Sequence, residues 1–197
     1  MTEAGRTLAR AAFRLNAGPL PPLVLMTDDE RLHDPCAAAR KLPSGSLIVV
    51  RARKNTRRRE LAGLLAKIAQ ERRLFLLIAD DPQLASGADG VHFPERRSGE
   101  ISYWRARRPD WFFTASAHSL RAALQAARFG ADAVFLSPVF PTKSHPDRAA
   151  LTPVRLRLMA QLAPVPIYAL GGIEAGNVQR LADAGLAGFA AIGALAG

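Results

Sequence analysis

Two short glycine-containing segments near the carboxyl end of the chain have the composition of an anion-binding site. Gly171 and Gly172 follow one apolar run, and Ile192 and Gly193 come at the end of another. Neighbouring glycines let backbone N–H groups approach an anion closely, and a helix that begins after them adds a favourable dipole. The same residues can also form a plain tight turn between a strand and a helix. The first alternative predicts a phosphate-binding site at these four residues.

Two adjacent carboxylates, Asp80 and Asp81, follow a third apolar run. Carboxylate oxygens at the end of a strand could bind Mg²⁺ beside a pyrophosphate group. The alternative is an aspartate cap, because Asp81 precedes Pro82 and an Asp-Pro pair commonly opens a helix. The residue types alone leave both alternatives open.

A proline-containing loop over residues 137–145 carries hydroxyl groups together with Lys143 and His145. These groups could hold anionic oxygens, and a loop of this kind could form a mobile lid. A plain surface loop stiffened by prolines is the alternative. His92 and His118 could act in acid–base chemistry, or could be packed, hydrogen-bonded histidines.

The chain has a formal net charge of +10, from 27 lysines and arginines against 17 acidic residues. Such a charge attracts polyanions, whether phosphates or nucleic acid. The densest basic patch runs from Arg51 to Arg59, and its last three arginines fit the solvated start of a helix. Nucleic-acid binding favours aromatic residues or a recognition helix beside the basic residues, and this patch contains no aromatic residue. We therefore expect phosphorylated small molecules as partners rather than nucleic acid.

Cys36 is the only cysteine, so the chain cannot form an internal disulfide, which suits a reducing cytoplasm. No uninterrupted apolar run approaches the ~20 residues of a membrane span. The first twenty residues lack the long apolar segment of an export signal. These features predict a cytoplasmic protein that does not insert into a membrane, and they leave open whether it forms a homo-oligomer.

Short apolar runs alternate along the chain with alanine-rich segments of helical periodicity. The runs, predicted as strands, cover residues 23–26, 46–50, 74–79, 90–93, 111–115, 133–136, 166–170 and 188–192. The predicted helices cover residues 6–15, 36–42, 57–72, 119–129, 151–162 and 177–184. This alternation is typical of parallel β/α architecture.

Eight predicted strands favour closure into a compact (β/α)₈ TIM barrel, with a doubly wound sheet as the competing arrangement. Residues 1–197 are predicted to form a single domain, with residues 1–22 as an N-terminal helical segment. No helix is predicted after the last strand, so the last helix of the barrel is missing. The N-terminal helix could cover the bottom of the barrel, without obviously replacing that helix. In such a barrel the chemistry lies at the carboxyl ends of the strands.

Short motifs stand at the ends of several predicted strands, in order along most of the chain. They are LVLMTD at residues 23–28, ASGADGVH at 85–92, SAHS at 116–119, PVFPT at 138–142, ALGGI at 169–173 and GFAAIGAL at 188–195. Together these segments resemble the motifs of the thiamine phosphate synthases and of their thiazole tautomerase (TenI) relatives. Each motif alone is short, and the order of all six makes the resemblance specific.

The resemblance implies a transferase of thiamine biosynthesis, which joins a hydroxymethylpyrimidine pyrophosphate to a thiazole phosphate and releases pyrophosphate with Mg²⁺. The residues that it assigns to the thiazole phosphate are Gly171, Gly172, Ile192 and Gly193. For the metal they are Asp80, with Asp81 beside it. We expect catalytic roles for Arg53, Ser116, Thr142, Lys143 and His145, and binding of the pyrophosphate or the pyrimidine by Arg51 and His118.

The chain departs from the family pattern at several of these places. The second metal aspartate of the family falls at Arg97, and the lysine of its loop falls at His145. Glu95 is a candidate to replace the lost carboxylate, and Arg97 is a candidate to bind phosphate instead of metal. The loop histidine of the tautomerase relatives falls at Pro138, so the tautomerase branch fits no better.

Three functions remain as hypotheses. The first is a transferase of the thiamine phosphate synthase type with altered metal use. The second is a family member without synthase activity, which isomerises or only binds a phosphorylated thiazole. The third, from another class, is a basic nucleic-acid-binding protein. The glycine segments favour the first two, and the altered metal residues distinguish between them.

Overall fold

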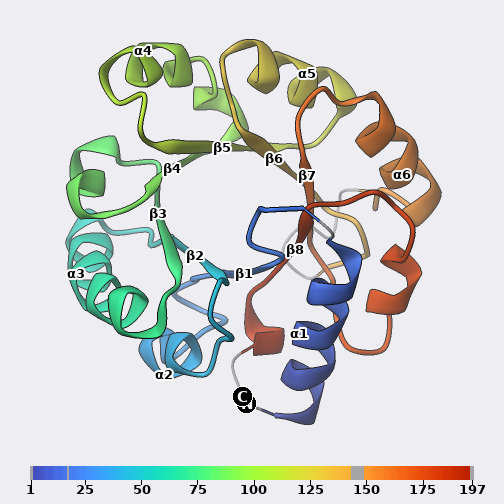
Figure 1. The fold of residues 1–197 in the computed structure, drawn as a ribbon, viewed down its shortest axis with the longest axis horizontal. Helices are drawn as coiled ribbons and strands as arrows, with labels where there is room; N and C mark the ends of the chain where they lie inside the picture. Colours follow the sequence, from blue (N-terminus) through green and yellow to red (C-terminus); the bar gives the residue numbers. More distant parts are fainter. Residues whose placement is uncertain (1, 17, 143–148, 196–197) are drawn as a thin grey trace.

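The computed structural model describes residues 2–16, 18–142 and 149–195. Eight short parallel strands follow one another around a closed barrel, and the last strand pairs with the first (Figure 1). The strands are β1 (Leu23–Met26), β2 (Leu47–Val50), β3 (Phe75–Ala79), β4 (Gly90–Phe93), β5 (Phe112–Ala117), β6 (Ala133–Leu136), β7 (Ile167–Leu170) and β8 (Gly188–Ala191). The predicted TIM barrel is confirmed, and the competing open sheet is wrong because every strand has two neighbours.

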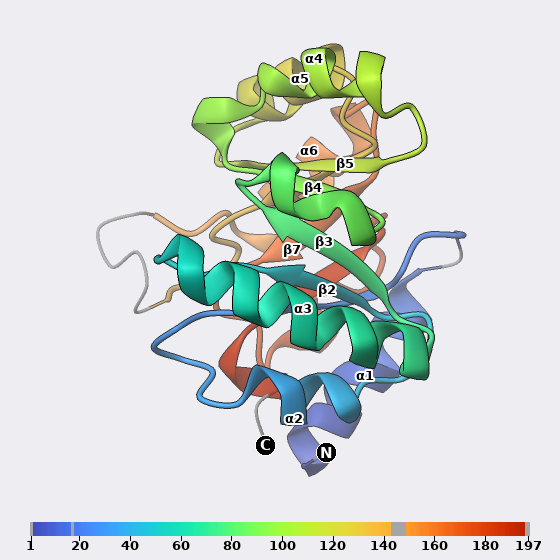
Figure 2. The ribbon, with the colours of Figure 1, turned by 90° about the vertical axis from the view of Figure 1, so that its left-hand side faces the viewer.

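Helices surround the barrel, as the side view in Figure 2 shows for α2 and α3. The α-helices are α1 (Glu3–Leu15), α2 (Pro35–Arg40), α3 (Asn55–Arg72), α4 (Glu100–Arg107), α5 (Leu120–Arg128) and α6 (Pro153–Leu162). Short 3₁₀ turns complete the connections: η1 (Pro82–Gly87), η2 (Glu95–Arg97), η3 (Val178–Leu181) and η4 (Gly193–Leu195). None of the helices that the structure describes is long and apolar enough to cross a membrane.

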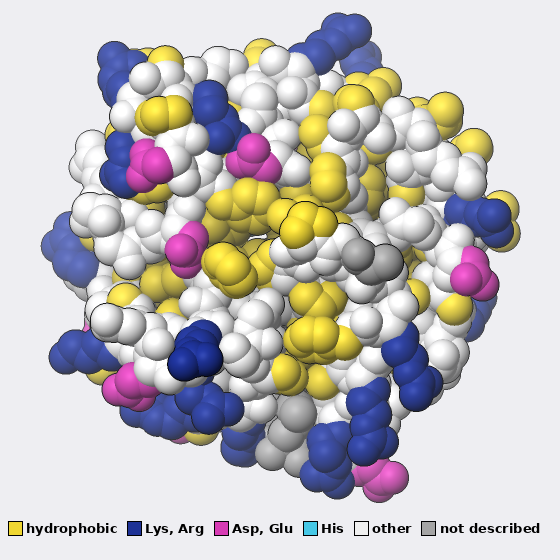
Figure 3. Space-filling model, viewed as in Figure 1, with side chains coloured by type: hydrophobic (Ala, Val, Ile, Leu, Met, Phe, Trp, Pro, Cys, Tyr) yellow, Lys and Arg dark blue, Asp and Glu magenta, His cyan; other side chains and the backbone are white. Residues whose placement is uncertain are grey.

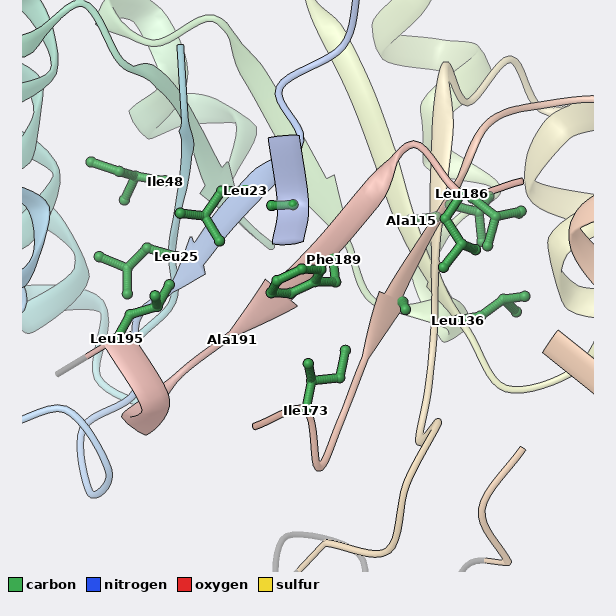
Figure 4. Packing of buried hydrophobic residues seen from close by; sticks show 14 of the residues in the cluster. Leu23, Leu25, Ile48, Ala115, Leu136, Ile173, Leu186, Phe189, Ala191 and Leu195 are labelled. Carbon is green, nitrogen blue, oxygen red and sulfur yellow. The ribbon is translucent and has the colours of Figure 1, made fainter. Parts of the chain in front are cut away.

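Two layers of apolar side chains hold the barrel together, because successive residues of a strand point to opposite sides of the sheet. Val24 and Met26 of β1 belong to the cluster inside the barrel. Leu23 and Leu25 belong to the larger cluster between the barrel and its helices, with Phe189 of β8 close by (Figure 4). Strands buried on both faces explain why they are apolar throughout rather than alternating.

Helix α1 lies against the outside of the barrel at β8 and β1, next to η3 and η4 (Figure 1). Its buried residues include Gly5, Leu8, Ala9 and Ala12, which recur at the spacing of one helix face, and also Ala11. The N-terminal helix thus covers the outer side of β8 and β1, a position that the sequence did not indicate. It does so because β8 would otherwise expose one apolar side to water.

The connection between β7 and β8 is the turn η3 and not the predicted helix over residues 177–184. The Asn177 side chain donates from Nδ2 to the backbone oxygen of Gly172 at 2.7 Å and accepts from the backbone N–H of Glu174 at 2.9 Å. An asparagine bonded to neighbouring backbone in this way competes with a regular helix. Asp183, with a φ of 60°, then turns the chain away from helical geometry.

Candidate active site at the carboxyl ends of the strands

Polar and charged groups gather at one end of the barrel. Figure 3 shows the other end, where apolar side chains surround the barrel axis and most lysine and arginine side chains lie towards the periphery. At the carboxyl ends of the strands the structure instead forms three cavities, each lined partly by polar groups. We call them the glycine pocket, the mouth cavity and the outer groove.

The glycine pocket has a volume of about 510 Å³ and lies at the ends of β7 and β8. It brings together all four residues predicted to bind a phosphate. Thr142 lies on its wall, and so do Arg31 and Ala4, the latter from the first turn of α1. Among its described lining residues Arg31 is basic and Glu174 is acidic, and the glycines let backbone N–H groups approach a ligand closely, which suits an anion such as a phosphate.

Glycine is required at the first two positions of this pocket. Gly171 and Gly172 have φ values of +97° and +67°, a region that other residues avoid. A β-carbon on Gly172 would lie 2.6 Å from the backbone oxygen of Pro141, and one on Gly171 would lie 3.0 Å from Cα of Pro138. The segment after β6 is bound here by the Phe140 N–H, which donates to the Gly171 oxygen at 3.1 Å. The glycines thus hold the start of the predicted lid against β7.

The mouth cavity, of about 250 Å³, lies over the open end of the barrel. Its wall contains Arg51, Ser116 and His118, three of the predicted site residues, and also Asp80. Leu170 lines both this cavity and the glycine pocket, so the two cavities are neighbours. Two ligands bound in them would approach each other at the end of β7.

Ser116 is oriented by a buried histidine. His92 is only 4% exposed, and its Nε2 lies 2.8 Å from Oγ of Ser116 while its Nδ1 lies 2.9 Å from Oγ1 of Thr114. Phe135 packs edge-on against the imidazole at 5.1 Å. Burial lowers the pKa of His92 to about 3, and the charge of Arg51 acts in the same direction. His92 is therefore neutral near pH 7 and acts as a hydrogen-bonding support for Ser116.

His118 is fixed at the other side of the mouth cavity. Its Nδ1 lies 2.7 Å from the backbone oxygen of Ser137, which can only accept, so Nδ1 carries the proton of this bond. Its backbone N–H donates to Oε2 of Glu95 at 2.8 Å. Glu95, the candidate replacement for a metal carboxylate, thus supports the turn after β5 with one of its oxygens.

Asp28 connects the two cavities by binding an arginine of each. Its Oδ2 accepts from Arg31, which lines the glycine pocket, at 2.7 Å and from Arg51, which lines the mouth cavity, at 2.5 Å. Burial acts to raise the pKa of Asp28, but the hydrogen bonds from Arg31 and from the backbone N–H groups of Arg31 and Glu30 outweigh it and hold that pKa well below its ordinary value. Asp28 is thus a permanent anion that positions both cations.

The predicted metal carboxylates lie where expected, at the end of β3, but each faces an arginine. Asp80 accepts from Arg97 at 2.5 Å and from Arg96 at 3.0 Å, one on each oxygen. Asp81 lies 3.9 Å from Arg58. Among the described residues no group of three or more metal-ligating side chains exists. Mg²⁺ binds proteins through one or two carboxylates with a free oxygen, and arginines occupy both oxygens of Asp80, so the residues present here do not fit it.

Arg97, which falls at the family's second metal position, is strongly held. Its guanidinium also donates to both carboxylate oxygens of Glu100, each at 2.5 Å. The hydrogen bonds to Glu100, against a smaller effect of burial, and those to Asp80 raise the pKa of Arg97 above its ordinary value. The same bonds to Arg97 lower the pKa of Glu100. Arg97 is therefore a permanent cation.

Arg53, like Asp81, lies on the outer groove and not on the mouth cavity. Its side chain is 78% exposed and binds Glu30 at 2.7 Å, on the wall of the outer groove of about 1020 Å³. Lys143 and His145 lie outside the described residues. Roles for all three in catalysis stay predictions.

Sequence reasoning missed Arg58 and Arg31 and left His92 undecided. Arg58 is 9% exposed and lines both the mouth cavity and the outer groove. The signal for Arg58 was present, because it precedes Leu61 and Leu65 of α3 at the spacing of one helix face. Arg31 belongs to an irregular loop, where no periodicity indicates which residues face a site.

Comparison with known proteins agrees with the fold and the motifs. The family model described as "Thiamine monophosphate synthase" matches residues 23–195. The thiamine-phosphate synthase of Chlorobium phaeovibrioides is 32% identical over 185 residues, which cover 90% of this chain and 88% of the relative. That of Pyrococcus furiosus is 31% identical over 176 residues, covering 86% and 84%. The solved structure of a thiamine phosphate pyrophosphorylase from Pyrococcus furiosus superimposes with a TM-score of 0.76 at 27% identity, covering 89% of this chain and 87% of that one. The chain belongs to the thiamine monophosphate synthase family.

Proposed function

We propose that this chain is a transferase of thiamine biosynthesis, which joins a hydroxymethylpyrimidine pyrophosphate to a thiazole phosphate and releases pyrophosphate. The observation that carries the proposal is the pair of neighbouring cavities at the carboxyl ends of the strands. One is lined by glycines and Arg31, and the other by Arg51, Arg58 and Ser116. Two anionic substrates of different shape fit such a pair better than one substrate does.

The glycine pocket would take the phosphate of the thiazole. The backbone of Gly171, Gly172 and Gly193 allows close approach, and Arg31 supplies a positive charge. The thiazole ring would then extend past Leu170 into the mouth cavity, since Leu170 lines both cavities.

The mouth cavity would take the pyrimidine pyrophosphate. The carbon–oxygen bond to pyrophosphate breaks and pyrophosphate leaves with the electron pair, while the lone pair of the thiazole nitrogen forms the new bond to that carbon. Arg51 and Arg58 stabilise the negative charge that develops on the leaving group. The Ser116 hydroxyl, held by His92, is in place to donate to one of its oxygens. No residue needs to deprotonate the thiazole nitrogen, which carries no proton.

The chain itself can be tested with the two purified phosphorylated precursors by measuring thiamine phosphate formation. We expect turnover, and a large loss of kcat in Ser116→Ala. Leu64→Ala, on the exposed side of α3 and on the wall of none of the three cavities, is the control for expression and folding. Absence of turnover with retained phosphate binding would favour the family member without synthase activity.

Nucleic-acid binding remains the alternative from another class, and the structure makes it less attractive. In the basic patch, Arg51, Arg53 and Arg57 each bind a carboxylate of the chain itself. Their charge is therefore partly compensated before any polyanion arrives.

A further inference from the structure

The carboxylate at the end of β3 is already neutralised by cations of the chain. Arg97 donates from Nη1 to Oδ1 of Asp80 and, at 2.9 Å, to the backbone oxygen of the same residue. Arg96 occupies the second carboxylate oxygen at 3.0 Å. Glu100 binds the other edge of the Arg97 guanidinium with both its oxygens. A guanidinium bound in this bidentate way is a fixed part of the structure.

A divalent cation at Asp80 would therefore need to displace an arginine and then remain beside it. Mg²⁺ takes oxygen ligands in octahedral geometry, whereas a guanidinium offers only N–H donors. Arg97 also offers no oxygen ligand and adds a positive charge beside Asp80. Both properties oppose a metal at this place.

Arg58 provides a second cation on the wall of the mouth cavity. Its side chain is nine-tenths buried, and it is fixed by bonds to the Ala52 backbone oxygen at 2.8 Å and to Oδ1 of Asn55 at 3.2 Å. Its Nε has no hydrogen-bond partner among the described residues. Because Arg58 lines both the mouth cavity and the outer groove, its positive charge lies next to an anion held in either one.

We propose that this chain binds the diphosphate group without a divalent cation held by the protein, with Arg97 as the fixed cation beside Asp80 and Arg58 as a direct ligand of the anion. The identity of the anion, an organic diphosphate or the pyrophosphate released from it, rests on the proposed function. The metal-free character rests on the arginine pairs alone. The outer groove and the mouth cavity meet at Asp80 and Arg58, which line both, and this is where the diphosphate lies.

The first experiment titrates the purified full chain with inorganic pyrophosphate by calorimetry, once in EDTA and once in excess Mg²⁺. We expect binding in EDTA with a Kd within about threefold of that in Mg²⁺. Arg58→Ala should weaken binding about tenfold or more, because a charge-assisted bond to a buried guanidinium is lost. Arg107→Ala removes the same charge from an exposed position over Tyr103 and should leave the Kd unchanged. Binding at least tenfold tighter in Mg²⁺ than in EDTA would overturn the proposal.

The second experiment measures Mn²⁺ bound to the protein by paramagnetic resonance. The unaltered chain should bind no Mn²⁺, whereas Arg97→Asp, which places a second carboxylate beside Asp80, should gain one equivalent. One equivalent on the unaltered chain would overturn the proposal, whether or not the variant folds. If the chain binds pyrophosphate in EDTA but forms no thiamine phosphate, the synthase function is refuted and this inference is supported. A failure of the proposed function can thus be told apart from a failure of metal-free binding.

Discussion

Replacement of Gly172 by alanine tests whether the segment after β6 really lies against the glycine pocket. At a φ of +67° a β-carbon costs about 1–2 kcal/mol by backbone strain alone. The same β-carbon would lie 2.6 Å from the Pro141 oxygen and 2.8 Å from Cβ of Phe140, so this segment has to move. We expect the free energy of unfolding to fall by about 2–4 kcal/mol, from strain and overpacking together.

Two other glycines separate these contributions. Gly185 has the same φ of +67°, but a β-carbon there would meet no described atom within 4 Å, so Gly185→Ala should lose only the strain of about 1–2 kcal/mol. Gly176 lines the glycine pocket with open space around it and without positive φ, so its alanine variant should change stability by less than about 0.5 kcal/mol. Urea denaturation with linear extrapolation measures all three.

Binding provides the second measurement for the same variants. Calorimetric titration with inorganic phosphate should show weaker binding for Gly172→Ala, because the displaced segment changes the wall that carries Thr142. Gly185→Ala, which does not line the pocket, should bind as the unaltered chain does. The reasoning would be refuted if Gly172→Ala unfolded no more easily than Gly185→Ala and bound phosphate with the same Kd.

Three further variants address single interactions. Because the folded chain keeps His92 neutral, with a pKa of about 3 against 6.5 when unfolded, stability is fully present above pH 6.5 and falls as the pH drops towards 3. Between these pH values, urea denaturation should show the free energy of unfolding falling by up to about 1.4 kcal/mol per pH unit because of this group. His92→Gln should lack this fall, and an equal dependence on pH in the variant and the unaltered chain would contradict the prediction. Arg31→Ala should raise the Kd for inorganic phosphate severalfold in calorimetry, whereas Arg40→Ala, on the exposed end of α2, should not. Tyr168→Phe breaks the buried bond of 2.9 Å to the Pro21 oxygen and should lower the free energy of unfolding by about 1–3 kcal/mol, with phosphate binding unchanged.

The barrel and the position of its site could be predicted because both depend on local patterns. Apolar runs such as residues 133–136 predict strands by composition, and parallel strands place their carboxyl ends together. This brought Gly171 and Gly193 into one predicted site although they are far apart along the chain. The helix over residues 177–184 failed for a local reason, because Asn177 bonds to the glycine loop instead of starting a regular helix.

The sequence could not predict which acidic and basic side chains on different connections form ion pairs. Asp80 and Arg97 lie on different connections, and their contact depends on the pairing of β3 with β4, which places the ends of these strands side by side. The sequence does not show whether the carboxylate of an aspartate is free or bound by a guanidinium. Asp80 was therefore predicted as a metal ligand. The packing of α1 against β8 could not be predicted for the same reason, because it joins segments that lie far apart along the chain.

A diphosphate site built from guanidinium groups differs from a metal site in how it releases its product. Mg²⁺ can leave together with pyrophosphate, whereas Arg58 and Arg97 stay behind and must give up every contact. The affinity of these arginines for pyrophosphate therefore has to be limited by the protein itself. Asp80, Asp81 and Glu100 do this, because their ion pairs with Arg58 and Arg97 partly neutralise the positive charge. On this argument Glu100→Gln, which frees one edge of Arg97, should tighten pyrophosphate binding and slow its dissociation. Stopped-flow measurement of pyrophosphate release checks it, and faster release in the variant would show that Glu100 serves only to position Arg97.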